Sequence, residues 1–369
     1  ISLFANTSFA ANRYWVGVDG GSVHDIANWS ASENLCGVGG GSSVPNTSDD
    51  VFFTTSCSNT INLNSNWSVK SINLSSGFII INSSNLTVVG DFIQTGGTFN
   101  SSIGSGTISI GGIFTLSGGI FYTSTGLTSF GNHFTQQPGS NFIANQGKVR
   151  FTGIRTTINV DQSLEFDDFE ILTTDWKIVA ANDTLVVNGD LYLTKGALFG
   201  SGVVDSKGNV YVSDIFNGGD SGVINIVGDE NSPPTDLVLN GGKVPNLLID
   251  NPNLSILYNA DTTFRSLTLK NFKDSFDINS FDLTVTGSFT QTGGTFNRSL
   301  GSGRIIIVGI FTISGGTFYT STNFTRFDNH FTQQPGGNFV ANQGRVVFTG
   351  FRTTINVDES LEFNDFEIL

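Results

Sequence analysis

A run of carboxylates in the segment LEFDDFEIL has the greatest potential for chemistry in this chain. Its members are Glu165, Asp167, Asp168 and Glu170, and their equivalents in a later copy of the segment are Glu362, Asn364, Asp365 and Glu367. Paired carboxylates can act as general acid and base on a glycoside or can ligate calcium. Catalysis by paired carboxylates would not be preserved in both copies, because the second copy has the amide Asn364 where the first copy has Asp167. We therefore predict a solvent-exposed acidic strand, with a structural calcium ion as the alternative and no catalytic site.

Histidines are the next candidates for acid–base chemistry. His133 and His330 occupy equivalent positions in two copies of NHFTQQPG, and His24 stands alone near the N-terminus. A catalytic histidine needs a nucleophile or an acidic partner, and no GxSxG or HxxE motif accompanies these residues. We predict that they lie at corners or on the surface.

The two cysteines, Cys36 and Cys57, lie in the least repetitive part of the chain. An even number of cysteines in a secreted β-rich protein usually pairs, so we predict a disulfide that closes a loop of the N-terminal cap. Two unpaired thiols are the alternative. A zinc site is disfavoured because the spacing is not that of a CxxC motif.

An internal repeat predicts the secondary structure in which these residues lie. Residues 90–172 recur as residues 287–369 without a gap, and 63 of the 83 positions are identical. Inside each copy, similar apolar residues recur at intervals of about 20 to 22, as in Val88, Ile110, Phe130 and Phe151. A coil of β-strands needs this period because each turn buries its inward side chains against the turns above and below it. The pattern predicts an all-β, right-handed parallel β-helix, a β-solenoid of about 15 turns that would be roughly 70 Å long.

Phenylalanines at this interval form the predicted core ladder. In the first copy the ladder residues are Phe92, Phe114, Phe134, Phe99, Phe121 and Phe142, and in the second copy they are Phe289, Phe311, Phe331, Phe296, Phe318 and Phe339. An exposed platform for sugar binding is the alternative. Phenylalanine has no polar group, and these residues recur in register with inward aliphatic residues, so we predict buried stacks.

Composition restricts the partners. The chain has 369 residues, 45 glycines, 33 phenylalanines, no methionine and 13% charged residues, which fits a β-rich extracellular protein. With 17 basic against 31 acidic residues, the net charge is −14 and there is no basic cluster, so nucleic acid is not an expected partner. No apolar run approaches the roughly 20 residues needed to span a bilayer.

The segment before the repeats contains YWVG, NWS and VP…DDVFF, and the repeats contain GDFIQTGGTFN and GSFTQTGGTFN. On these motifs, nearly the whole chain resembles large bacterial surface proteins of the β-helix adhesin or autotransporter-passenger type. The resemblance implies architecture and a cell-surface location, without specifying an activity. We divide the chain into a terminal strand and cap (1–58), a first repeat copy (59–172), a diverged segment (173–286) and a second copy (287–369). Pro233 and Pro234 mark the expected loop excursion in the diverged segment.

The first residues suggest a route to assembly. The segment from Ile1 to Ala10 is apolar, with Ile1, Leu3, Phe4 and Phe9 as its bulky members. Such a strand could pack on its own cap or complete the open edge of a neighbouring coil, which would propagate into a filament.

These features together predict a secreted structural or adhesive surface protein that forms a stiff rod, possesses no enzymatic activity or cofactor, and self-associates. A carbohydrate or another cell-surface component is the expected ligand if there is one. The alternative is a pectin-lyase-like enzyme acting on a polysaccharide. That chemistry would require several carboxylates and a basic residue to converge in a lateral groove.

Overall fold

The computed structural model describes residues 10–100, 104–144, 146–298, 301–341, 344–350, 354–358 and 360–369. Parallel strands stack turn upon turn, so the fold is an all-β solenoid with about 15 turns in all. A single turn of 3-10 helix, η1 (Ile26–Asn28), is the only helix in the described ranges. The chain divides into two compact units, Ile1–Glu170 and Ile171–Leu369, which we describe separately.

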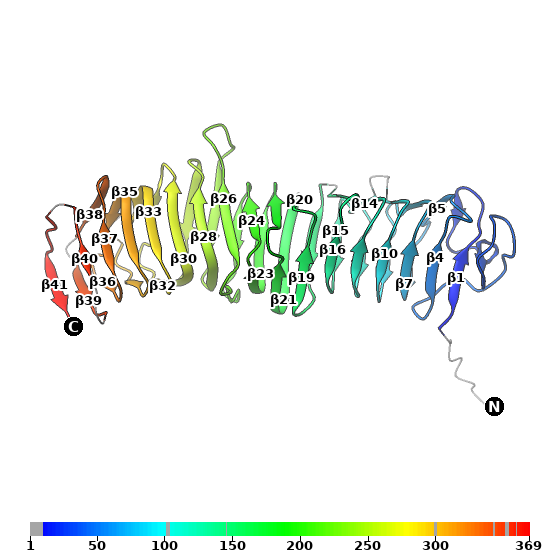
Figure 1. Cartoon of the computed structure of the whole chain (residues 1–369), viewed down its shortest axis with the longest axis horizontal. Coiled ribbons are helices and arrows are strands. Elements are labelled where there is room, and N and C mark those ends of the chain that lie inside the picture. The colour runs from blue at the N-terminus through cyan, green and yellow to red at the C-terminus, as the bar shows by residue number, and fades with distance from the viewer. Residues whose placement is uncertain are drawn as a thin grey trace, which may run out of the picture. The chain divides into compact units, whose positions relative to one another are not determined.

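The strands of the first unit are short (Figure 1). They are β1 (Asn12–Trp15), β2 (Gly21–Ser22), β3 (Trp29–Ser30), β4 (Asp50–Phe53), β5 (Thr60–Asn62), β6 (Trp67–Val69), β7 (Ser71–Leu74), β8 (Phe78–Ile80), β9 (Leu86–Val88), β10 (Phe92–Gln94), β11 (Thr98–Phe99), β12 (Ile108–Ile110), β13 (Phe114–Leu116), β14 (Ile120–Tyr122), β15 (Leu127–Phe130), β16 (Phe134–Gln136), β17 (Asn141–Ile143), β18 (Lys148–Phe151), β19 (Thr156–Asn159) and β20 (Ser163–Phe166).

Strand β21 (Asp168–Val179) runs from the first unit into the second. The second unit continues with β22 (Thr184–Val187), β23 (Leu191–Gly200), β24 (Val203–Ser206), β25 (Val210–Val212), β26 (Val223–Val227), β27 (Thr235–Leu239), β28 (Lys243–Asp250), β29 (Leu254–Tyr258), β30 (Thr262–Asn271), β31 (Ser275–Phe276), β32 (Leu283–Val285), β33 (Phe289–Phe296), β34 (Ile305–Ile307), β35 (Phe311–Tyr319), β36 (Phe324–Phe327), β37 (Phe331–Gln333), β38 (Gly337–Val340), β39 (Arg345–Phe348), β40 (Ile355–Asn356) and β41 (Asp365–Ile368).

Three columns of parallel strands form the faces of the coil in the first unit. One column runs β4, β7, β10, β13, β16 and β19, a second runs β5, β8, β11, β14 and β17, and a third runs β6, β9, β12, β15 and β18. Each strand pairs with the strand one turn away, and apolar residues of successive turns lie opposite one another along a column. Val88, Ile110, Phe130 and Phe151 are paired in this way. The repeat interval therefore equals one turn.

Corners between the faces need residues that accept a left-handed backbone. Asn100 has a φ of 55° and Asn297, its equivalent in the second unit, also has 55°. Asparagine tolerates this conformation better than other residues with a side chain, which explains its place at the end of GGTFN.

The N-terminal cap surrounds two tryptophans. Trp15 and Trp29 are buried, and their rings meet edge to face at 5.2 Å. The Nε1 group of Trp29 donates a hydrogen bond to the carbonyl of Val23, which satisfies its polar end. Strand β1 pairs with β3 in the antiparallel sense and with β4 in the parallel sense. The cap therefore continues directly into the first coil.

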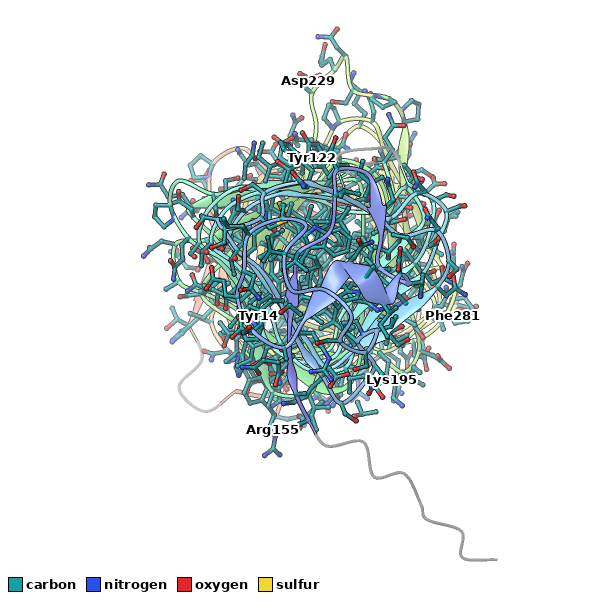
Figure 2. The ribbon with its side chains drawn as sticks, turned by 90° about the vertical axis from the view of Figure 1, so that its right-hand side faces the viewer. Tyr14, Tyr122, Arg155, Lys195, Asp229 and Phe281 are labelled. Carbon is teal, nitrogen blue, oxygen red and sulfur yellow. A yellow bond between two sulfur atoms is a disulfide. The ribbon has the colours of Figure 1, made fainter. Side chains whose placement is uncertain are left out.

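The second unit uses longer strands that turn corners without interruption. Strand β30, for example, pairs with β32 through Thr262–Phe264 and with β33 through Leu267–Leu269. The segment 228–234 leaves the coil between β26 and β27 and contains Pro233 and Pro234, where an excursion was predicted. Figure 1 shows this loop rising above the neighbouring turns, and Figure 2 labels Asp229 in it.

Candidate functional site

Two columns of phenylalanine rings fill the interior of the first unit. Phe92, Phe114 and Phe134 lie on successive turns, with ring centroids 5.7 and 4.9 Å apart. Phe99 and Phe121 stack at 4.7 Å, and Phe142 continues the second column 5.5 Å from Phe121. All six side chains are buried. The two columns touch edge to face, as in the contact of Phe114 with Phe121 at 4.9 Å, so the aromatic interior is interlocked.

The second unit repeats this core. Its rings at Phe289, Phe311 and Phe331 are spaced by 5.4 and 4.8 Å, and those at Phe296, Phe318 and Phe339 by 4.6 and 5.6 Å. These rings are also buried. The predicted ladder residues therefore lie in the interior of their units, where they stabilise the coil instead of offering a platform to a sugar.

Buried amides form hydrogen bonds inside the coil that sequence reasoning missed. Gln94 is fully buried, and its Nε2 group donates to the carbonyls of Gly97 and Ile120 on adjacent turns. Gln291 makes the equivalent contacts in the second unit, with the carbonyls of Gly294 and Thr317. A glutamine in a polar motif such as QTGG resembles a surface residue, and only its repetition at an inward position could have revealed its burial.

The cap contains the two cysteines as a disulfide. Cys36 and Cys57 are joined, with their Cα atoms 4.9 Å apart. Asp49 anchors a neighbouring loop, because its buried carboxylate accepts hydrogen bonds from the backbone amides of Ala11 and Asn46. The cap is thus fastened both by a covalent bond and by the buried carboxylate of Asp49, the first residue of the DDVFF motif.

The acidic run is not uniformly exposed, which corrects one expectation. Glu165 is exposed, whereas Glu170 is only 6% exposed and accepts a hydrogen bond of 2.8 Å from Nε of Arg150. Nζ of Lys148 lies 4.0 Å from the same carboxylate oxygen. A strand pattern predicted Glu170 to face solvent, but cations on the preceding turn cover it. In the second unit Glu367 pairs with Arg345. These contacts give the acids at these positions a structural role in cross-turn ion pairs.

The equivalent histidines lie at exposed corners, where they accept backbone hydrogen bonds. Nδ1 of His133 accepts from the amide of Thr157 at 3.0 Å, and Nδ1 of His330 accepts from the amide of Thr354 at 3.1 Å. His24 lies in the cap, with Nε2 3.3 Å from the carbonyl of Ser65. Each histidine joins one turn to another within its own unit.

A lysine lies in the interior of the second unit. Lys177 on β21 is fully buried, and burial lowers the pKa of its amine to about 8. Desolvation favours the neutral amine because the charged form loses its hydration. Nothing in the sequence distinguished Lys177 from a surface lysine, since the segment DWKIV does not alternate clearly.

The lateral active site of the enzymatic alternative would occupy a surface cleft. One cleft on the second unit has a volume of about 370 Å³, and Asp220 is the one carboxylate among its lining residues. Lys243 and Arg265 also line it. A second cleft, with a volume of about 510 Å³, lies beside the loop 228–234 and is lined by Lys207 and Asp229 among other residues. The convergence of several carboxylates that a pectin-lyase-like site would require is not present in either cleft.

Other predictions concern ions, membranes and the N-terminal segment. In the described part of the chain, no group of three or more His, Cys, Asp or Glu side chains is arranged to hold a metal ion. No helix there has the length and apolarity needed to cross a bilayer. The predicted assembly residues Ile1, Leu3, Phe4 and Phe9 lie outside the described residues.

Comparisons with known proteins complete the description of the site. The chain matched no protein-family model, no curated protein and no solved structure.

Proposed function

We propose that this chain is a secreted, non-catalytic surface protein whose solenoid serves as a stiff structural or adhesive rod. The observation that carries the proposal is the interior of each unit, where stacked phenylalanine rings fill the coil and paired strands join every turn to the next. Bending such a coil would separate the turns on one side, which strains backbone hydrogen bonds and ring contacts together. The physical property that the fold supplies is resistance to bending.

Secretion to a surface is supported by the disulfide and by the charge. The bond between Cys36 and Cys57 suits an oxidising compartment, because thiols in a reducing cytosol seldom remain paired. The net charge of −14 would keep a long polar rod soluble and apart from its neighbours. Thiol labelling of unreduced material from its natural source, after separation of extracellular and cellular fractions, tests both points. Free thiols or an exclusively intracellular protein would contradict this part of the proposal.

Electron microscopy of the purified chain tests stiffness directly. We expect straight particles with little variation in curvature. A variant with Phe114→Ala and Phe311→Ala, which removes one central ring from each unit, should give more strongly bent particles, whereas Phe78→Ala should not, because Phe78 is 49% exposed. Equal curvature in all three proteins would show that the aromatic interior does not determine stiffness.

The non-catalytic part of the proposal is tested with polygalacturonate as substrate. We expect no release of unsaturated products and no new reducing ends on incubation with the chain, with an active pectin lyase as the positive control. Activity that is lost on substitution of Asp220, the carboxylate that lines the cleft of about 370 Å³, would replace the structural role with the enzymatic alternative.

Filament formation is the finer part of the proposal. The segment from Ile1 to Ala10 is apolar and suited to pairing with an exposed strand edge of another copy. Such a contact joins different surfaces on the two copies, so it propagates instead of closing as a dimer. Deletion of residues 1–10 should leave folded monomers, and filaments formed by the deleted chain would contradict this route.

A further inference from the structure

The cleft of the second unit that is lined by Lys243 and Arg265 has features that a structural rod does not need. It lies along the outer side of β28 and β30 and is bounded by the turn that contains Gly218 and Gly219. Its volume of about 370 Å³ falls in the range of small-molecule sites. The lining residues include Phe199, Asn217, Lys243, Thr263, Arg265 and Thr286.

Backbone contacts hold the turn that contains Gly218 and Gly219, which forms one wall of the cleft, in a fixed position. Gly219 has a φ of 134°, and a Cβ atom there would lie 1.8 Å from the carbonyl oxygen of Leu198, so only glycine fits. The amide of Leu198 donates to the carbonyl of Gly218 at 2.6 Å, and the amide of Lys243 donates to the carbonyl of Phe216 at 2.8 Å. These bonds fasten the turn to strands on both sides. A ligand would therefore meet a preformed site, which lowers the entropic cost of binding.

The cleft holds two cations that lack an acidic partner. Neither Lys243 nor Arg265 lies within salt-bridge distance of a carboxylate in the described part of the chain, although acids outnumber bases almost two to one. Two cations nearby in this unit are paired, Lys270 with Asp250 and Arg304 with Asp282. Asp220 also lines the cleft, so the local balance is two positive groups to one negative group. An anion is the complementary ligand.

The spacing of the cations favours an extended ligand over a single small ion. Lys243 of β28 faces Thr263 of β30, and Arg265 follows Thr263 by two residues on the same side of the strand. The Cα atoms of Lys243 and Arg265 are then roughly 8 Å apart, from the strand separation and the rise per residue. Two acidic groups carried on one chain match this separation better than one phosphate or sulfate does.

The remaining lining residues favour a sugar over an acidic peptide. Phe199 is partly exposed, and its ring packs against that of Trp176, with the two ring centroids 5.9 Å apart. An aromatic surface of this kind packs against the apolar face of a sugar ring, while Thr263 and Asn217 supply groups that can hydrogen-bond hydroxyls. We propose that this cleft binds an acidic oligosaccharide, with Lys243 and Arg265 contacting its acidic groups. The site goes beyond the structural role and does not depend on filament formation.

Calorimetric titration of the full-length chain tests the proposal. The probes are a short oligogalacturonate, a neutral dextran oligomer of the same length and an oligoglutamate peptide. We expect the oligogalacturonate to bind with an affinity that falls as salt is added, and the other two probes to bind about tenfold more weakly or not at all. Equal binding of the neutral oligomer would overturn the role of the cations, and equal binding of the peptide would overturn the preference for a sugar.

Variants distinguish the cleft from general electrostatics. Lys243→Gln with Arg265→Gln should weaken oligogalacturonate binding about tenfold or more, because each substitution removes a charge-assisted contact. Lys270→Gln with Lys273→Gln removes the same net charge from the same unit outside the cleft and should change the affinity by less than about twofold. Circular dichroism of both variants verifies folding. Equal losses in the two variants, or no binding by the unaltered chain, would overturn the proposal.

Discussion

The two repeat copies, residues 90–172 and 287–369, have nearly the same interior and different outer faces. Phe99 and Phe121 stack at 4.7 Å, and their equivalents Phe296 and Phe318 stack at 4.6 Å. On the outer face, Arg150 of the first copy binds Glu170, whereas Val347 occupies the equivalent position in the second copy. The interior is therefore constrained by stacking at every turn, while the outer face can exchange one type of contact for another.

At the turn corners next to the two copies, one type of contact has likewise been exchanged for another. Oδ1 of Asn85 accepts a hydrogen bond from the amide of Thr107 at 2.8 Å. In the second unit Oδ1 of Asp282 accepts from the amide of Arg304 at 2.7 Å, and the Arg304 side chain pairs with the same carboxylate. The corner bond is kept, but a neutral amide has been replaced by an ion pair. The comparison shows that the position in the turn determines which residue accepts the corner hydrogen bond. The charges of the two residues can differ between the units without loss of that bond.

The largest expected effect tests the equivalence of the two interiors. Phe114→Ala and Phe311→Ala should each reduce the local free energy of unfolding by about 3 to 5 kcal/mol, because each removes a buried ring between two others. Hydrogen exchange measured by mass spectrometry on peptides of each unit gives the two values separately. The exposed Phe78→Ala serves as the control and should cost less than about 0.5 kcal/mol. A large difference between the two core variants would show that the interiors are not equivalent.

Removal of the disulfide should lower the stability of the first unit and leave that of the second unit unchanged. Replacing Cys36 and Cys57 with alanine should destabilise the cap by about 3 kcal/mol, since the bridge closes a loop of 21 residues in the unfolded chain. Exchange in the second unit should not change, because the bridge lies wholly in the first unit. Mass spectrometry that finds free thiols in the unreduced parent chain, or a uniform loss of protection over both units, would contradict this expectation.

The ion pair of the first copy is the next largest effect. Arg150→Val, which installs the residue of the second copy, should cost about 1 to 3 kcal/mol because the buried Glu170 carboxylate loses a charged donor. The control Arg326→Ser removes a cation of the second copy that pairs with Asp328 at a more exposed site and should cost less than about 1 kcal/mol. Local unfolding free energies from exchange check both. A smaller loss for Arg150→Val than for Arg326→Ser would refute the structural role assigned to Glu170.

The smallest effect concerns acid sensitivity at the corners. Burial opposes ionisation of Asp282, but hydrogen bonds and the charge of Arg304 outweigh it, so the pKa of Asp282 is held below its ordinary value of 3.8. The carboxylate therefore stabilises the folded unit fully above pH 3.8, and this contribution is lost as the pH falls through the lower folded-state pKa. The amide signal of Arg304 in an NMR titration should report the loss, and that of Thr107 should not. Asp282→Asn should abolish the response, and persistence of it would assign the effect to another group.

Much of the fold could be predicted because one turn of the solenoid has a constant length. The interval that relates Phe92, Phe114 and Phe134 in the sequence is the interval that places them in one column, so local pattern and stacking agree. Glu170 was placed wrongly, since alternation along a strand does not reveal that Arg150 covers the carboxylate from the turn before.

The sequence by itself determined the all-β class, the period of the coil and the identity of its aromatic core, because these depend on side chains that recur at one spacing. Only the tertiary structure decided that Gln94 and Lys177 are buried and that Lys243 and Arg265 share a cleft with Phe199. Those outcomes depend on how neighbouring turns are aligned sideways and on where a glycine turn approaches a strand. The same core period is compatible with several sideways alignments of neighbouring turns. A repeat pattern therefore specifies which residues stack in the core, whereas the surroundings of the residues outside the core depend on how the turns pack.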